Sequence, residues 1–129
     1  MSFFKNIFNS SDEKDSNEKK IDWKELTEIG QLDEISAISN EKSIAIFKHS
    51  TRCSVSRMAL KQFENEFNSS DKVTPYFLDL IAHRDISNEI ANRFGVTHQS
   101  PQLILIKDGK AIYHVSHSDI DAESLKAKV

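Results

Sequence analysis

The sequence contains a single cysteine, no long apolar run and no excess of basic residues. One cysteine cannot build a framework of structural disulfides within the chain, so its thiol is either buried and inert or reactive. No segment approaches the roughly 18–20 apolar residues that a membrane-spanning helix requires. A net charge of −3 argues against nucleic acid or an anionic membrane as the main partner. We therefore expect a protein that binds neither.

The N-terminal region bears on location and domain organisation. Its first eight residues are too short and too interrupted for the apolar region of a signal peptide, which runs to about 7–15 residues. We therefore expect a reducing, cytoplasmic setting. Residues 9–20 contain no apolar side chain and cannot bury a core, so residues 1–20 are predicted to form a disordered tail. The folded domain is predicted over residues 21–129.

Hydrophobic periodicity predicts alternating strands and helices from residue 21 onward. Pro75 is expected to open its strand, Asp85 and Gly95 to cap a helix, and Asp108-Gly109 to form a two-residue hairpin turn. In order, the segments are an opening stretch around Trp23 and Leu26, a helix after Gly30, a strand at 43–47, a helix at 53–68, a strand at 76–81, a helix between Asp85 and Gly95, strands at 103–106 and 111–115, and a helix at 121–128.

Strands that alternate with helices and end in a hairpin predict an α/β fold, with a mixed sheet and helices on both faces. The strands at 43–47 and 76–81 flank a crossover helix, so we expect them to be parallel with a right-handed connection. Chemistry in such sheets collects at the carboxyl ends of the strands. Cys53 follows one of these ends, after a short polar turn.

Cys53 stands at the start of the helix predicted at 53–68. A sulfur there faces unpaired backbone N–H groups and the positive end of the helix dipole, both of which favour thiolate over thiol. Lys48 and Arg52 add positive charge nearby, and His49 is a candidate to tune the thiol, although a structural role for it is slightly favoured. The apolar residues of this helix recur at helical spacing: Val55, Met58, Ala59, Phe63 and Phe67.

Ser56 occupies the position where a C-x-x-C dithiol enzyme has its second cysteine. A thiolate that attacks a disulfide sulfur forms a mixed disulfide. The Ser56 hydroxyl could donate a hydrogen bond to the Cys53 sulfur, but it cannot attack that intermediate. The small thiol is therefore expected to remain on Cys53 until another soluble thiol removes it, which predicts thiol transfer rather than dithiol reduction.

The segment Ser100-Pro101-Gln102, with the strand and the Lys107-Asp108-Gly109 turn after it, resembles the second half of the thioredoxin fold. In that fold the proline is cis and packs against the active-site thiol. The resemblance implies the same for Pro101. Ser100 is then expected to offer its backbone groups to an extended substrate.

Taken with the Phe47–Ser56 segment, Arg84–Ala91 and Ser116-His117, these residues resemble the YtxJ-like family, the monothiol bacilliredoxins of the bacillithiol system. The resemblance runs from about Trp23 to the C-terminus and implies reduction of mixed disulfides between proteins and bacillithiol, a cysteinyl-glucosamine malate thiol. It implies Cys53 and Ser56 as catalytic residues, and Thr51, Arg52, Ser100 and Pro101 as substrate contacts. It also implies no bound cofactor, a small thiol as co-substrate and S-thiolated proteins as partners. We expect the protein to be a monomer. Ser54 departs from the pattern, because a proline often follows the family cysteine.

Three other functions stay open at this point. The Cys53–Arg57 segment also resembles the loop of glutaredoxin-type arsenate reductases, although an oxyanion would need more arginines. A monothiol glutaredoxin-like carrier would hold an iron–sulfur cluster with one protein cysteine and a soluble thiol per subunit, but Ser54-Val55 replaces the glycine-phenylalanine pair of that loop. A non-catalytic thioredoxin-like interaction module is the third.

Other polar residues are weaker candidates. The five histidines and one cysteine show no metal-ligand spacing, so no metal site is predicted. His98 and His117 could line the same cleft as Cys53, and Arg57 could contact an acidic group of the small thiol. A surface position is the favoured interpretation for all three.

Overall fold

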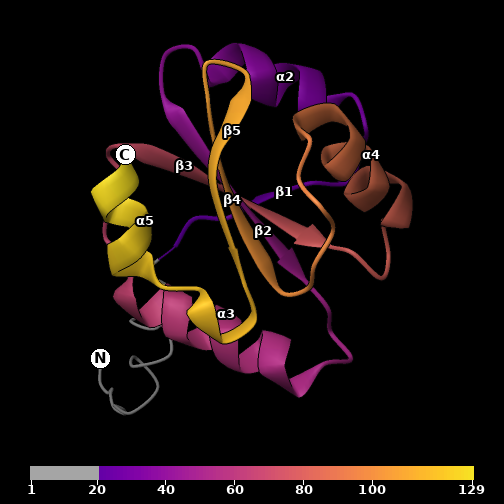
Figure 1. The fold of residues 1–129 in the computed structure, drawn as a ribbon, viewed down its shortest axis with the longest axis vertical. Helices are drawn as coiled ribbons and strands as arrows, with labels where there is room; N and C mark the ends of the chain where they lie inside the picture. The colour runs from indigo at the N-terminus through magenta and orange to yellow at the C-terminus, as the bar shows by residue number, and fades with distance from the viewer. Residues whose placement is uncertain (1–20) are drawn as a thin grey trace, which may run out of the picture.

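The computed structural model describes residues 21–129, so the tail predicted at 1–20 lies outside the described residues (Figure 1). The observed order of strands and helices is the predicted one, with an additional short 3-10 helix before the last helix. The elements are β1 (Lys24–Glu25), α2 (Gln31–Ile38), β2 (Ser43–His49), α3 (Ser54–Glu66), β3 (Val73–Asp79), α4 (Arg84–Phe94), β4 (Gln102–Lys107), β5 (Lys110–Ser116), η2 (His117–Asp119) and α5 (Ala122–Lys128).

The five strands form one mixed sheet in the order β1-β3-β2-β4-β5. β3 pairs in parallel with both β1 and β2, which confirms the parallel pairing predicted for the two strands around the crossover helix. β4 is antiparallel to β2 and to β5. β2 therefore lies at the centre, and all seven of its residues are buried.

Helices cover both faces of the sheet, as predicted (Figure 1). Each face has its own apolar core. Successive residues of a strand point to opposite faces, so β2 contributes Ile44 and Ile46 to one core and Ala45 and Phe47 to the other. The first core also contains residues of α2 and α4, and the second contains residues of α3 and α5. The same alternation places the next two residues of β2, Lys48 and His49, on opposite faces.

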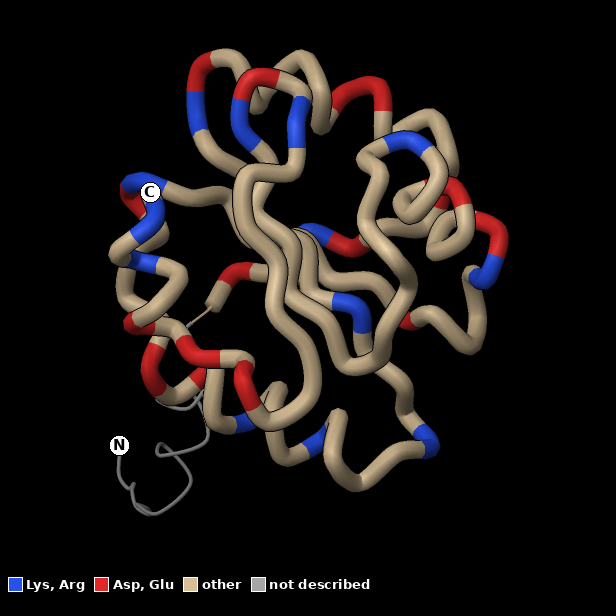
Figure 2. Tube along the Cα trace, viewed as in Figure 1, with Lys and Arg blue, Asp and Glu red and all other residues tan. Residues whose placement is uncertain are grey.

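Charged residues lie mainly on the helices and outer turns, with both signs interspersed, while the central strands carry few of them (Figure 2). This distribution agrees with a chain of small net charge. A charged residue inside the sheet is therefore an exception, and Lys48 of β2 is such a residue.

Two local expectations were wrong. Pro75 is the third residue of β3 rather than its first, and β1 pairs with β3 only at Tyr76 and Phe77. Pro75 therefore has a neighbouring strand on one side only, which tolerates a residue without an N–H group. His83, not Asp85, precedes the first turn of α4, and Asp85 lies within that turn, where a carboxylate favours the helix dipole.

Gly95 and the Asp108-Gly109 turn behave as predicted. Gly95 ends α4 in the left-handed conformation, with φ of 67°. Asp108 and Gly109 both have positive φ, 53° and 75°, in the two-residue turn between β4 and β5. Asp121 caps α5 by accepting a hydrogen bond from the backbone N–H of Ser124 at 2.9 Å.

We predict that Gly109→Ala destabilises the fold, whereas Gly30→Ala does not. A methyl group at either position would contact nothing within 4 Å, so the two substitutions differ in backbone conformation alone. Gly109 has φ of 75°, and a side chain in that region costs about 1–2 kcal/mol. Gly30 has φ of −58°, a conformation that alanine adopts without strain, so replacing it should leave the free energy of unfolding unchanged or raise it by up to about 1 kcal/mol. Urea denaturation measures both values, and equal losses would contradict this account.

Candidate active site

Cys53 occupies the position directly before the first turn of α3, at the carboxyl end of the central strand. The turn is closed by a hydrogen bond from the Cys53 N–H to the Ser50 carbonyl at 3.2 Å, and the Cys53 carbonyl accepts from the Arg57 N–H at 3.1 Å. The thiol is free and half-buried, and it makes no capping hydrogen bond to the helix. The sulfur is thus placed at the N-terminus of a thirteen-residue helix without being used to build it.

The loop that contains Pro101 lies beside the end of β2. In the antiparallel register Lys48 pairs with Gln102, so Pro101 sits next to the residues that leave β2 toward Cys53. The Ser100-Pro101 peptide bond is cis, as the resemblance to the thioredoxin fold implied. Pro101 is buried, and its carbonyl accepts from the N–H of His117 at 2.9 Å.

The side chains of Ser100 and Gln102 lie in the same loop but differ in their bonding. The Ser100 hydroxyl is buried without a hydrogen-bond partner among the described residues. Gln102 is almost fully buried, and its amide donates to the Thr97 carbonyl at 3.0 Å and accepts from the Gln99 N–H at 3.4 Å. Gln102 therefore holds the loop closed, a role that its place next to Pro101 in the sequence did not reveal.

Ser56 is fully buried and joins the turn to the helix. Its Oγ accepts from the Ser50 N–H at 3.0 Å and lies 2.8 Å from Nδ1 of His49. Within residues 21–129 the Ser56 hydrogen bonds run to these two residues and not to the Cys53 sulfur. Ser56 thus links the end of β2, the turn and α3 at one point.

His49 is buried on the α3 face of the sheet, packed against the rings of Phe47 and Phe77. Burial lowers the pKa of His49, while the nearby Asp79 and Glu64 oppose this and Arg57 adds to it. The imidazole is therefore neutral near neutral pH. Its partner is Ser56 rather than Cys53 itself, so any influence on the thiol runs through the serine.

Lys48 faces the opposite side of the sheet and is fully buried. Its ammonium group donates to the Ser87 carbonyl of α4 at 3.2 Å and lies 3.3 Å from Nδ1 of His98. Burial lowers the pKa of Lys48 to about 8. That the positive charge of Lys48 favours the Cys53 thiolate stays a prediction. Sequence reasoning missed Ser87 as its partner, although Ser87 follows Ile86 on the inner side of α4.

Thr51 and Arg52 are both exposed in the turn before Cys53. The Thr51 carbonyl accepts from the guanidinium of Arg57 at 3.2 Å, so Arg57 folds back over the turn. His98, in the loop before Pro101, and His117, the first residue of η2, are both exposed, which agrees with a surface position for both.

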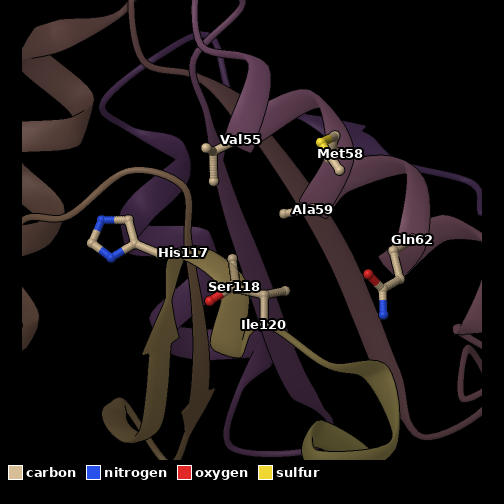
Figure 3. Close-up of a pocket in the computed structure, with 7 residues that line it drawn as sticks. All are labelled: Val55, Met58, Ala59, Gln62, His117, Ser118 and Ile120. Atoms are coloured by element: carbon tan, nitrogen blue, oxygen red, sulfur yellow. The ribbon is translucent and has the colours of Figure 1, made fainter.

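An apolar groove of about 240 Å³ begins two residues after Cys53. Figure 3 shows side chains of α3 facing those of the η2 segment across it. Met58 is 72% exposed and Val55 46%, although the helical spacing grouped them with the buried Phe63 and Phe67. The helical spacing of apolar residues could not distinguish the residues that line this groove from those that are buried in the core. The lining residues are Val55, Met58, Ala59, Gln62, His117, Ser118 and Ile120.

In the part of the chain that the structure describes, no helix is long and apolar enough to cross a membrane. The same residues contain no group of three or more His, Cys, Asp or Glu side chains arranged to hold a metal ion.

The buried Lys48 predicts a pH-dependent stability. Its pKa is about 8 in the folded protein against a usual value of 10.5, so between these values the unfolded chain binds a proton that the folded protein does not. Stability therefore rises with pH across this window. Lys48→Met removes this contribution, so wild type should gain stability relative to the variant as pH rises from 8 to 10.5. Urea denaturation at several pH values measures the difference, and a constant difference would contradict the prediction.

Comparisons with known proteins agree with this geometry. The family model of the monothiol bacilliredoxin BrxC matches residues 24–125. A solved candidate oxidoreductase with a thioredoxin fold is 31% identical, with a TM-score of 0.69 over 80% of this chain and 89% of that one.

Thioredoxins share the fold at lower identity. The thioredoxin of Malassezia sympodialis is 22% identical, with a TM-score of 0.64 over 85% of this chain and 90% of that one. The thioredoxin of Trypanosoma brucei brucei is 17% identical, with a TM-score of 0.64 over 84% of this chain and 88% of that one. The chain therefore belongs to the monothiol bacilliredoxin family and is a thiol–disulfide oxidoreductase with a thioredoxin-like fold and a single cysteine.

Proposed function

We propose that Cys53 removes bacillithiol, or a closely similar small thiol, from mixed disulfides with proteins. The Cys53 thiolate attacks the sulfur of the small thiol, and the target protein leaves as a thiolate that takes a proton from water. A second molecule of small thiol then attacks the adduct as its thiolate. It releases the disulfide of two small thiols and restores the Cys53 thiolate. The observation that carries this proposal is the lone cysteine with Ser56 at the resolving position.

The residues around Cys53 supply contacts for such a substrate. The cis loop holds Ser100 and Pro101 beside the end of β2, where backbone groups of Ser100 can pair with an extended substrate. Thr51 and Arg52 are exposed in the turn before the thiol. The positive charge of Arg52 suits a small thiol that carries carboxylates, such as the malate group of bacillithiol.

The protein part of the mixed disulfide is proposed to contact the apolar groove between α3 and η2. Val55 and Met58 are exposed there, close to Cys53 in the helix. Exposed apolar surface beside a reactive group favours contact with another polypeptide. His117 links the two regions, because it lines the groove and donates its N–H to Pro101.

We further propose a cytoplasmic location and action as a monomer. A reducing compartment keeps a lone thiol reduced, which the transfer reaction requires. The reduced small thiol that discharges the adduct would come from the same compartment. A separate reductase would reduce the released disulfide back to the small thiol.

The resolving position gives a direct test. With a bacillithiol-capped target protein, wild type should accumulate a mixed disulfide on Cys53, and Cys53→Ser should accumulate none. Ser56→Cys should lose the adduct, because the new thiol displaces the small thiol and forms an internal disulfide. Intact-protein mass spectrometry distinguishes the adduct, the unmodified chain and the internal disulfide. An adduct that accumulates equally in wild type and Ser56→Cys would count against the proposed role of position 56.

The groove predicts a difference between protein and small substrates. Met58→Glu places a charge in the groove and should raise KM for a capped protein by roughly fivefold or more, as loss of an interface contact worth about 1 kcal/mol would. The rate with a small symmetrical disulfide should not change. Ile112→Glu is the matched control, because Ile112 is an exposed apolar residue of β5 outside the groove. If Met58→Glu affects both substrates equally, the groove does not bind the protein part.

A further inference from the structure

A buried histidine lies behind the hydroxyl at the resolving position. His49 is 5% exposed, and its Nδ1 is 2.8 Å from Oγ of Ser56. The same Oγ accepts the Ser50 N–H at 3.0 Å. A serine hydroxyl has one proton and two lone pairs, so Ser50 leaves Ser56 one lone pair and one proton to share between His49 and a further group.

The proton between Ser56 and His49 decides what Ser56 can offer to that further group. If the Ser56 hydroxyl donates to Nδ1, its free lone pair can accept a hydrogen bond from a thiol. If Nδ1 carries the proton and donates to Oγ, the hydroxyl proton is free to bond a thiolate. The first arrangement therefore suits a protonated cysteine, and the second suits a thiolate.

Cys53 and Ser56 lie close together at the start of α3. Cys53 is the extended residue directly before the helix, and Ser56 is the third residue of the first turn, the spacing at which a capping residue and the third helical residue face each other. In a dithiol enzyme, cysteines at these two positions close a disulfide, which needs Cβ atoms about 3.5–4.5 Å apart. For Ser56 to bond the thiol, the half-buried Cys53 side chain must turn its sulfur toward the Ser56 hydroxyl.

His49 also reaches a second pocket that the transfer reaction does not use. This pocket of about 560 Å³ is lined by residues of α3 together with His49. Because Nδ1 is bonded to Ser56, Nε2 is the ring nitrogen available to the pocket. The other lining residues are Arg57, Leu60, Lys61, Glu64 and Asn65.

The charges around His49 suit an imidazole that accepts a proton and passes it on. Burial keeps the ring neutral near neutral pH, so it can accept. Asp79 of β3 and Glu64 of α3 favour the protonated ring, whereas Arg57 disfavours it. Lys61 is the other cation that lines the pocket. Glu64 is fixed by the indole N–H of Trp23 at 2.7 Å.

We propose that Ser56 and His49 form a proton relay between the Cys53 sulfur and the pocket that His49 lines together with α3. The Cys53 proton passes to Oγ of Ser56 as the Ser56 proton passes to Nδ1 of His49. The imidazolium then loses its Nε2 proton to water in the pocket. Cys53 is left as a thiolate that accepts a hydrogen bond from Ser56. His49 is thus a positioning residue that acts through Ser56. This inference rests on Cys53 being the nucleophile of the proposed function.

Nitrogen NMR of the histidine rings in the full chain tests the relay directly. With Cys53 as thiolate, His49 should carry its proton on Nδ1. After Cys53 is blocked with iodoacetamide the sulfur no longer needs a donor, and the proton should move to Nε2. His114, exposed on β5, serves as the control and should not change. If His49 keeps the same tautomer in both states, the relay is wrong.

The rate of Cys53 alkylation as a function of pH is the second readout, and it needs no disulfide substrate. Ser56→Ala and His49→Phe should each slow alkylation near neutral pH by about tenfold, the effect of losing a hydrogen bond to a charged group. The double variant should be no slower than the slower single variant, because both act on one path. Phe at position 49 keeps the packing against Phe47 and Phe77.

His49→Asn separates a relay from a fixed hydrogen bond. An asparagine amide can bond Ser56 but cannot take up the proton and release it to the pocket, so alkylation should stay slow. A wild-type rate in His49→Asn, or additive losses in the double variant, would overturn the relay. A wild type that alkylates as expected but transfers no small thiol would instead contradict the proposed function alone.

Discussion

The pairing of the central strand with its two neighbours is the constraint on which the site depends. β2 is parallel to β3 and antiparallel to β4, and this register brings the cis loop beside the turn that leads to Cys53. Strand and helix are separated by only four residues, from Ser50 to Cys53. The position of the sulfur therefore follows from the hydrogen bonds of the sheet, and a buried strand cannot shift its register without exposing its apolar residues.

The alternation of side chains along β2 then divides the polar groups near the site. Lys48 points to the α4 side and bonds Ser87, whereas His49 points to the α3 side and bonds Ser56. Two adjacent residues thus serve separate networks on opposite faces of the sheet. Most buried polar groups in proteins are hydrogen-bonded, and both of these residues are. The network around Ser56 is the one that reaches the thiol.

Much of the fold was predictable, because strands and helices alternate with clear periodicity and the turns carry Gly95 and Asp108-Gly109. Local rules failed where pairing between distant segments decides the outcome. Pro75 lies inside a strand because β1 begins to pair only after it, and α4 begins before Asp85. The cysteine and the cis proline were found from motifs. The bonding of Ser56 to His49 was not, because it joins residues seven apart across a strand, a turn and a helix.

The account as a whole stands on a single sulfur that carries the small thiol between two reactions. A single-turnover experiment tests this most directly: the wild-type chain is mixed with one equivalent of a bacillithiol-capped protein, without free thiol. We predict that one small thiol appears on Cys53 for each target thiol released, and that it remains there until free thiol is added. Release of the target thiol with no adduct on Cys53 would contradict the account.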